Sequence, residues 1–159
     1  MHAYCLCLTK RRHPVDIIDR LSQFCENEDV ADWFFLGGRF SNFLPVSSNT
    51  KYIDGYEGGH RIDAPPKGEP PLGMRTYASH IKWVNAAKIS KIRYDQISRA
   101  QERGETDVSR PYAFFIDLPD GSFEYLPNED GHISLNDLWF SRYDVLDGKT
   151  LAVVMDIHF

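Results

Sequence analysis

The chain has 159 residues, of which 42% are hydrophobic, and its formal net charge is −5. This length suits one domain, the hydrophobic content is enough for a folded core, and an acidic chain lacks the basic face that direct nucleic-acid binding needs. Apolar runs such as 33–36 and 151–155 are far shorter than the roughly 20 residues of a membrane span. We therefore expect a single domain, 1–159, that binds neither nucleic acid nor a membrane directly.

The first residues also indicate a compartment. An apolar stretch at 3–8 precedes the basic residues 10–12, which is the reverse of the order in a secretory signal. The cysteine count is odd, and Cys5 and Cys7 are too close along one strand for a disulfide. We expect a cytoplasmic protein with reduced thiols.

The N-terminal part of the chain predicts a strand followed by a helix. Residues 2–9 read as a strand with Ala3, Cys5 and Cys7 on one face. Pro14 suits the first position of a helix, where its missing N–H costs nothing. The apolar residues that follow repeat at helical spacing and form one stripe: Ile17, Ile18, Leu21, Phe24 and Cys25.

The stretch 32–44 holds five aromatic residues, a double glycine and one arginine. It predicts two short strands bent around Gly37-Gly38. The next stretch, 45–77, contains five of the nine prolines and five of the eleven glycines. It predicts a long Gly/Pro-rich loop, and loops of that length in compact domains are usually functional or disordered.

The second half predicts a helix over 78–104 that ends near Gly104, then a hairpin with strands 112–118 and 122–126 around Pro119-Asp120-Gly121. Ser134 and Asp137 resemble a capping box that opens a third helix. Residues 150–158 predict a last strand that is too continuously apolar to be an edge. The order β-α-β-β-loop-α-β-β-α-β predicts an α+β domain, a mainly antiparallel sheet with about three helices packed on one face.

The double glycine and Arg39 have two interpretations. In the first, the backbone amides of Gly37 and Gly38 and the cation of Arg39 bind a phosphate or carboxylate, while Trp33 stacks on a ring and a lid that includes His60 and Arg61 folds over them. In the second, the glycines form a tight bend, Arg39 pairs with an acid and the aromatic residues belong to the core. We favour the second interpretation. The predicted ligand-binding residues under the first are Trp33, Gly37, Gly38, Arg39, His60 and Arg61.

The two terminal strands suggest a further cluster. If their faces align, Cys5 and Cys7 meet Asp156 and His158, which is a donor set for a borderline-soft metal. The simpler interpretation is that the cysteines are buried packing residues, so we predict no metal and no cofactor. Catalytic residues stay unassigned, with His60, His158 and Asp156 as the candidates for handling a proton.

Familiar catalytic motifs are missing from the sequence. There is no G-x-G-x-x-G, H-E-x-x-H, C-x-x-C or G-x-S-x-G. Gly148-Lys149-Thr150 looks like the end of a phosphate-binding loop, but the position five residues before Gly148 is Tyr143 and a strand is expected to follow. These absences favour a binding protein over an enzyme of a common class.

The run Asp32-Trp33-Phe34-Phe35-Leu36-Gly37-Gly38-Arg39-Phe40 resembles the hallmark of an uncharacterised family of small bacterial and phage proteins. That hallmark is Trp-Asp-Trp-Tyr, two variable residues and Gly-Gly-Arg-Trp. Ala31 stands where the first Trp would be, and Phe34 and Phe40 replace other aromatic residues. The family often ends in Asp-x-His, which Asp156-Ile157-His158 resembles. The resemblance implies a bacterial or phage setting and points again at Arg39, with no activity attached.

Two functions follow as expectations. The first is a small cytoplasmic, non-enzymatic binding or accessory protein, encoded by a phage or mobile element and acting on a host protein in the host cytoplasm, for example as a defence-system inhibitor. The alternative is a small enzyme that binds a nucleotide or other phosphate-bearing ligand through Gly37-Gly38-Arg39. The sequence does not determine the oligomeric state.

Overall fold

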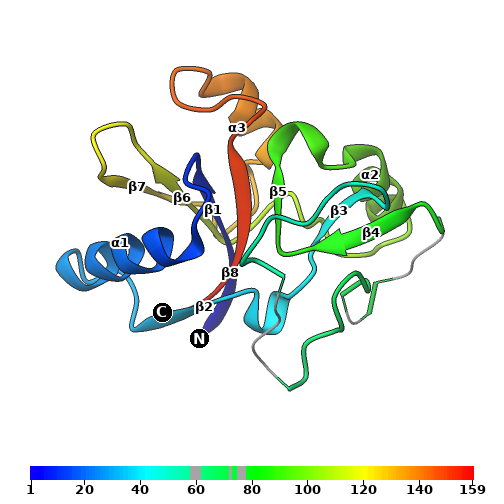
Figure 1. Cartoon of the computed structure of the whole chain (residues 1–159), viewed down its shortest axis with the longest axis horizontal. Coiled ribbons are helices and arrows are strands. Elements are labelled where there is room, and N and C mark those ends of the chain that lie inside the picture. The colour runs from blue at the N-terminus through cyan, green and yellow to red at the C-terminus, as the bar shows by residue number, and fades with distance from the viewer. Residues whose placement is uncertain (58–61, 72, 75–77) are drawn as a thin grey trace.

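The computed structural model describes residues 1–57, 62–71, 73–74 and 78–159. Within them lies a six-stranded mixed sheet whose main path has the order β2 (Trp33–Leu36), β8 (Leu151–His158), β1 (His2–Thr9), β6 (Ala113–Asp117) and β7 (Phe123–Pro127), and β5 (Ala86–Lys88) also pairs with β8. A second, two-stranded sheet joins β3 (Leu44–Ser47) to β4 (Ile81–Val84). Three α-helices accompany the sheets in the described part of the chain, so the predicted α+β class with a mainly antiparallel sheet is confirmed (Figure 1).

The N-terminal prediction is confirmed. Strand β1 spans His2–Thr9 and α1 spans Pro14–Asn27, with Pro14 in its first turn. The helix buries Ile17, Leu21 and Cys25 against the sheet, as its apolar stripe predicts. Strand β1 lies in the middle of the sheet, antiparallel to β8 and parallel to β6.

The central stretch follows the prediction only in its first half. Strand β2 covers Trp33–Leu36 and pairs with β8. The expected second strand does not follow the glycines directly, because Gly38–Phe40 forms one turn of 3-10 helix, η1. The next strand, β3, covers Leu44–Ser47 and pairs with β4 rather than with β2. The predicted loop therefore starts about three residues later than 45.

The predicted helix over 78–104 is wrong in its first half. Residues Ile81–Val84 form β4, Ala86–Lys88 form β5, and Ile89–Lys91 form the 3-10 turn η2. Helix α2 covers only Tyr94–Glu102, and Gly104 follows with a φ of +78°. Asn85 separates the two strands: its side chain accepts the amide of Asn42 at 2.6 Å and its carbonyl accepts the amide of Val154 at 2.7 Å.

The C-terminal predictions are largely confirmed. Strands β6 (Ala113–Asp117) and β7 (Phe123–Pro127) form the hairpin, and Gly121 takes the left-handed position with a φ of +89°. Helix α3 covers Leu135–Ser141, and Ser134 caps it by accepting the Asp137 amide at 3.1 Å. Strand β8 covers Leu151–His158 and is central, since β1 lies on one side and β2 and β5 on the other.

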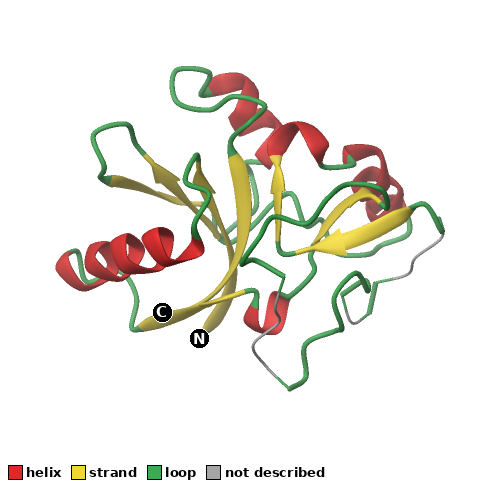
Figure 2. Cartoon of the chain, viewed as in Figure 1, coloured by secondary structure: helices red, strands yellow, loops and turns green. Residues whose placement is uncertain are grey.

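Both faces of the large sheet are covered, which corrects the expectation of helices on one face. Odd-numbered residues of β1 and β8 pack with α1 in one core cluster, whereas even-numbered residues pack with α2, α3 and the small sheet in another. Figure 2 shows α1 apart from the other two helices, with sheet between them. In the described part of the chain, no helix is long and apolar enough to cross a membrane.

Candidate functional site

Asp156 is a fully buried residue of the last strand, and its carboxylate contacts the backbone beside the double glycine. Its Oδ2 accepts the backbone N–H of Arg39 at 2.9 Å, and its Oδ1 lies 2.8 Å from His2 Nδ1. A Cβ placed on Gly38 would lie 2.5 Å from Asp156 Cβ, and the φ of Gly38 is +57°. The glycine is therefore needed to bring the backbone against the buried carboxylate.

The amides around the double glycine are engaged within the protein. Gly37 donates its N–H to the carbonyl of Val154 at 2.8 Å, and Arg39 donates its own to Asp156. The Arg39 guanidinium is exposed, and it has no ion pair or hydrogen bond with the residues that the structure describes. The bend itself is thus structural, and only the Arg39 side chain is offered to solvent.

A second His–Asp pair lies beside the first. His158 Nδ1 is 3.1 Å from Asp32 Oδ2, and the Trp33 ring stacks on His158 with a centroid distance of 4.9 Å. The His2 ring meets Trp33 edge-on at 5.0 Å. The cross-strand register accounts for this cluster, because Trp33, His158 and His2 occupy facing positions on three neighbouring strands.

This cluster joins two histidines to two carboxylates through hydrogen bonds, and the Asp32 side chain is the most exposed of the four, at 69%. Asp156 and His158 share a strand face, as their spacing suggests, yet each has a different partner. Asp156 has no exposed surface, so it cannot contact a substrate directly. The third candidate, His60, and its neighbour Arg61 lie outside the described residues, as does the proposed Gly58–Arg61 lid.

The structure separates the thiols from the histidines. Cys5 and Cys7 are fully buried on the α1 face of the sheet, whereas His158 belongs to the opposite face. Burial raises the pKa of both thiols well above the ordinary value, so they are neutral packing groups at neutral pH. No group of three or more His, Cys, Asp or Glu side chains with metal-binding geometry is found among the residues described.

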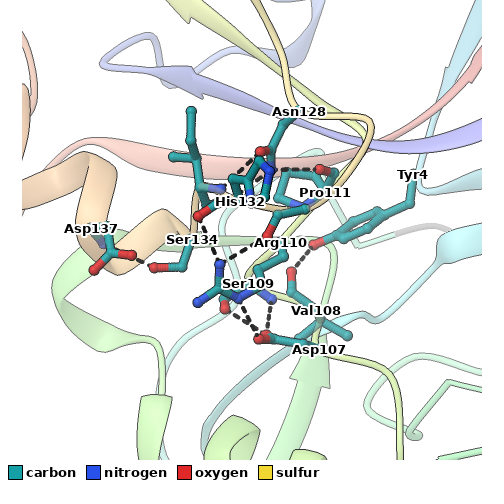
Figure 3. Close-up of polar contacts among 12 residues, drawn as sticks. Tyr4, Asp107, Val108, Ser109, Arg110, Pro111, Asn128, His132, Ser134 and Asp137 are labelled. Atoms are coloured by element: carbon teal, nitrogen blue, oxygen red, sulfur yellow. Dashed lines mark hydrogen bonds and ion pairs between the residues drawn. The ribbon is translucent and has the colours of Figure 1, made fainter.

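Figure 3 shows another polar cluster, which ties the loop 107–111 to the turn 128–134. Asn128 donates its amide to the carbonyls of Pro111 and Ile133, at 2.9 and 2.8 Å. Arg110 donates to the carbonyls of Gly131 and His132, at 2.9 and 3.0 Å, and Tyr4 donates to Val108 at 2.6 Å. These groups satisfy one another, so the cluster fixes loops and is not a site.

The outer edge of β2 is accessible. This strand ends the large sheet, and the side chains of Trp33 and Phe35 are 40% and 43% exposed. A hollow of about 690 Å³ follows this edge between β2 and α1. Its apolar lining includes Ile18, Phe34 and Leu36. We call this hollow, together with the strand edge, the β2 groove.

The charged side chains that line the β2 groove among the described residues are acidic. Glu26, Asp29 and Asp32 line it, and no lysine or arginine does among the described residues. The sequence predicts Trp33 as a ligand-binding residue but not Glu26 or Asp29, because these two come from the end of α1 and the loop after it. The alternation of Trp33 and Phe35 with Phe34 and Leu36 was the available signal, and only the topology shows that this strand is an edge.

The bend is also tied to the long loop. Asn42, with a φ of +61°, donates its side-chain amide to the carbonyls of Pro65 and Pro66 at 3.1 and 2.7 Å. This contact joins Asn42 to 65–66, whereas the expected lid at 58–61 lies outside the described residues.

Comparison of this chain with protein-family models, with curated proteins and with solved structures finds no match. The structure itself defines the class as a single α+β fold with a mixed, mainly antiparallel sheet and an accessible edge strand.

Proposed function

We propose that this chain is a non-enzymatic binding protein whose partner adds an extended segment to the edge of β2 in the β2 groove. The observation that carries the proposal is the position of β2: it is the end strand of the sheet, its aromatic side chains are exposed, and a hollow runs along it. Edge strands present unpaired backbone groups, and added strands gain affinity from them and specificity from adjacent pockets.

The lining of the β2 groove defines the chemistry of the partner. Its apolar floor, including Phe34 and Leu36, suits one or two apolar side chains of the incoming segment. Its carboxylates, Glu26, Asp29 and Asp32, suit lysine or arginine. The occupant is therefore an extended segment of a partner protein in which apolar and basic residues alternate.

The polar groups beside the groove support binding over catalysis. Asp156 holds His2 and the Arg39 amide, and His158 holds Asp32, so these groups maintain the edge of the sheet. A phosphate at Gly37-Gly38-Arg39 would have to displace Asp156 from the Arg39 amide. For this reason we do not place the alternative nucleotide site at the double glycine.

The biological setting belongs to the proposal as well. Action on a host protein in the host cytoplasm, by a protein encoded on a phage or mobile element, rests on the sequence resemblance at 32–40. The acidic β2 groove is compatible with that setting, since it would compete for a basic segment of the host partner.

A selection from a random peptide library tests the proposal. Peptides that bind the wild-type protein are expected to alternate apolar residues with lysine or arginine. The double variant Glu26→Lys, Asp29→Lys reverses the charge of the groove and should select acidic residues instead. The matched control Glu102→Lys, Asp130→Lys makes the same charge change at two exposed positions outside the groove and should keep the wild-type preference.

Three results would contradict this proposal. One is the absence of any selected peptide, and another is an identical shift of preference in both double variants. The third is concentration-dependent dimerisation that peptides do not compete with, because the edge would then be occupied by a second copy of the chain.

A further inference from the structure

Five lysines come from the segments of β4, β5 and η2 and from the long loop, and Figure 1 shows β4 at the end of the molecule opposite α1. Lys82 is in β4, Lys88 in β5 and Lys91 in η2, while Lys51 and Lys67 come from the long loop. Three of them line a hollow of about 420 Å³, which we call the lysine pocket: Lys51, Lys88 and Lys91. This hollow shares no lining residue with the β2 groove.

No described residue neutralises the charge of the lysine pocket. None of the five lysines has an ion pair with a described residue, and none of the described lining residues is acidic. Asn49 and Thr50 also line the pocket, and their side chains make no hydrogen bond within the described part of the chain. Cations and free polar donors thus converge on one hollow in a chain whose net charge is −5.

The Tyr52 ring makes cation-π contacts with two of these lysines. The ammonium groups of Lys67 and Lys82 lie 3.9 and 3.8 Å from the centroid of its ring. Partial burial and then the charge of Lys67 lower the pKa of Lys82, as expected where like charges are brought together. The ring offsets part of that repulsion for Lys67 and Lys82. It does not explain why Lys51, Lys88 and Lys91 face the same hollow.

We propose that the lysine pocket binds a small ligand that carries two or more phosphate groups. Its volume lies in the range of small-molecule sites, which begins at about 300 Å³. Lysine ammonium groups bind phosphate as point charges, and several of them in one hollow favour an anion of multiple charge. Because the Tyr52 ring already contacts two ammonium groups, recognition depends on the phosphate groups and not on stacking of a base.

Isothermal titration calorimetry with inorganic tripolyphosphate tests the site. Tripolyphosphate should bind more tightly than pyrophosphate, and pyrophosphate more tightly than sulfate, with all affinities falling as sodium chloride is added. ATP should bind about as tightly as tripolyphosphate. The double variant Lys88→Gln, Lys91→Gln should weaken tripolyphosphate binding by about tenfold or more, because two of three lining cations are lost.

The control variant is Arg12→Gln, Arg20→Gln, which removes two basic side chains that do not line the pocket, one just before α1 and one within it. It should change the affinity less than about twofold, since charges at a distance are screened. Equal weakening in both double variants would overturn the proposal, because binding would then follow net charge alone. Failure of tripolyphosphate and ATP to bind, or binding of long polyanions such as heparin without binding of tripolyphosphate, would overturn it too.

Discussion

Asp156 and Gly38 illustrate what a single pair of residues does in this fold. Asp156 is buried at the centre of the sheet and needs donors, and the Arg39 amide is one of them. Gly38 must therefore approach the carboxylate more closely than any residue with a Cβ could. The sequence predicts that the double glycine is a bend. It does not predict what the bend surrounds, because Asp156 is 117 residues away along the chain.

The substitution Gly38→Ala tests this role. The new Cβ would meet Asp156, and a left-handed φ alone costs a non-glycine residue roughly 1–2 kcal/mol. We expect urea denaturation to show a loss of about 3 kcal/mol in the free energy of unfolding. Gly131→Ala is the control, since Gly131 has a φ of +70° but nothing within 4 Å of its added Cβ. It should lose about 1 kcal/mol, and equal losses would refute the clash with Asp156.

At the scale of elements, the sequence predicts those strands and helices whose signals are local. Strand β1, helix α1 and the β6–β7 hairpin have regular alternation, a favourable proline or a turn residue at the required place. The helix prediction is wrong over 78–93 because Ile81, Val84 and Ile92 are also spaced as in a helix. Pairing with β3 and β8 decides the outcome, and these partners lie far away in the sequence.

Three thiols are buried where helix α1 packs on the sheet, so their reactivity tests this packing. Cys5, Cys7 and Cys25 are buried, and burial raises the pKa of Cys25 to about 11. At pH 8 only about one Cys25 thiol in a thousand would then be a thiolate. We expect a maleimide or disulfide reagent to label the native protein slowly and the urea-unfolded protein at once. Fast labelling of Cys5 or Cys7 in the native protein would show that α1 does not cover them.

Across the whole molecule, negative and positive side chains are concentrated in different places, which the net charge does not show. The β2 groove, lined in part by α1, carries carboxylates, and the lysine pocket, beside β5 and the small sheet, carries ammonium groups. Figure 1 shows α1 and the small sheet on opposite sides of β8. The sequence predicts an acidic protein, but it cannot reveal this separation. Glu26 and Asp32 line the same groove because α1 packs beside β2. Lys51 and Lys88 line the same pocket because the long loop lies beside β5.

We propose above that an extended, basic segment adds to the edge of β2. Hydrogen–deuterium exchange, measured with and without a peptide selected on the wild-type protein, tests this directly. The peptide should slow exchange at 31–36 and along 22–29, the two sides of the β2 groove, and leave the strands β3 and β4 unchanged. Protection elsewhere, or binding that leaves the exchange of β2 unaltered, would contradict it.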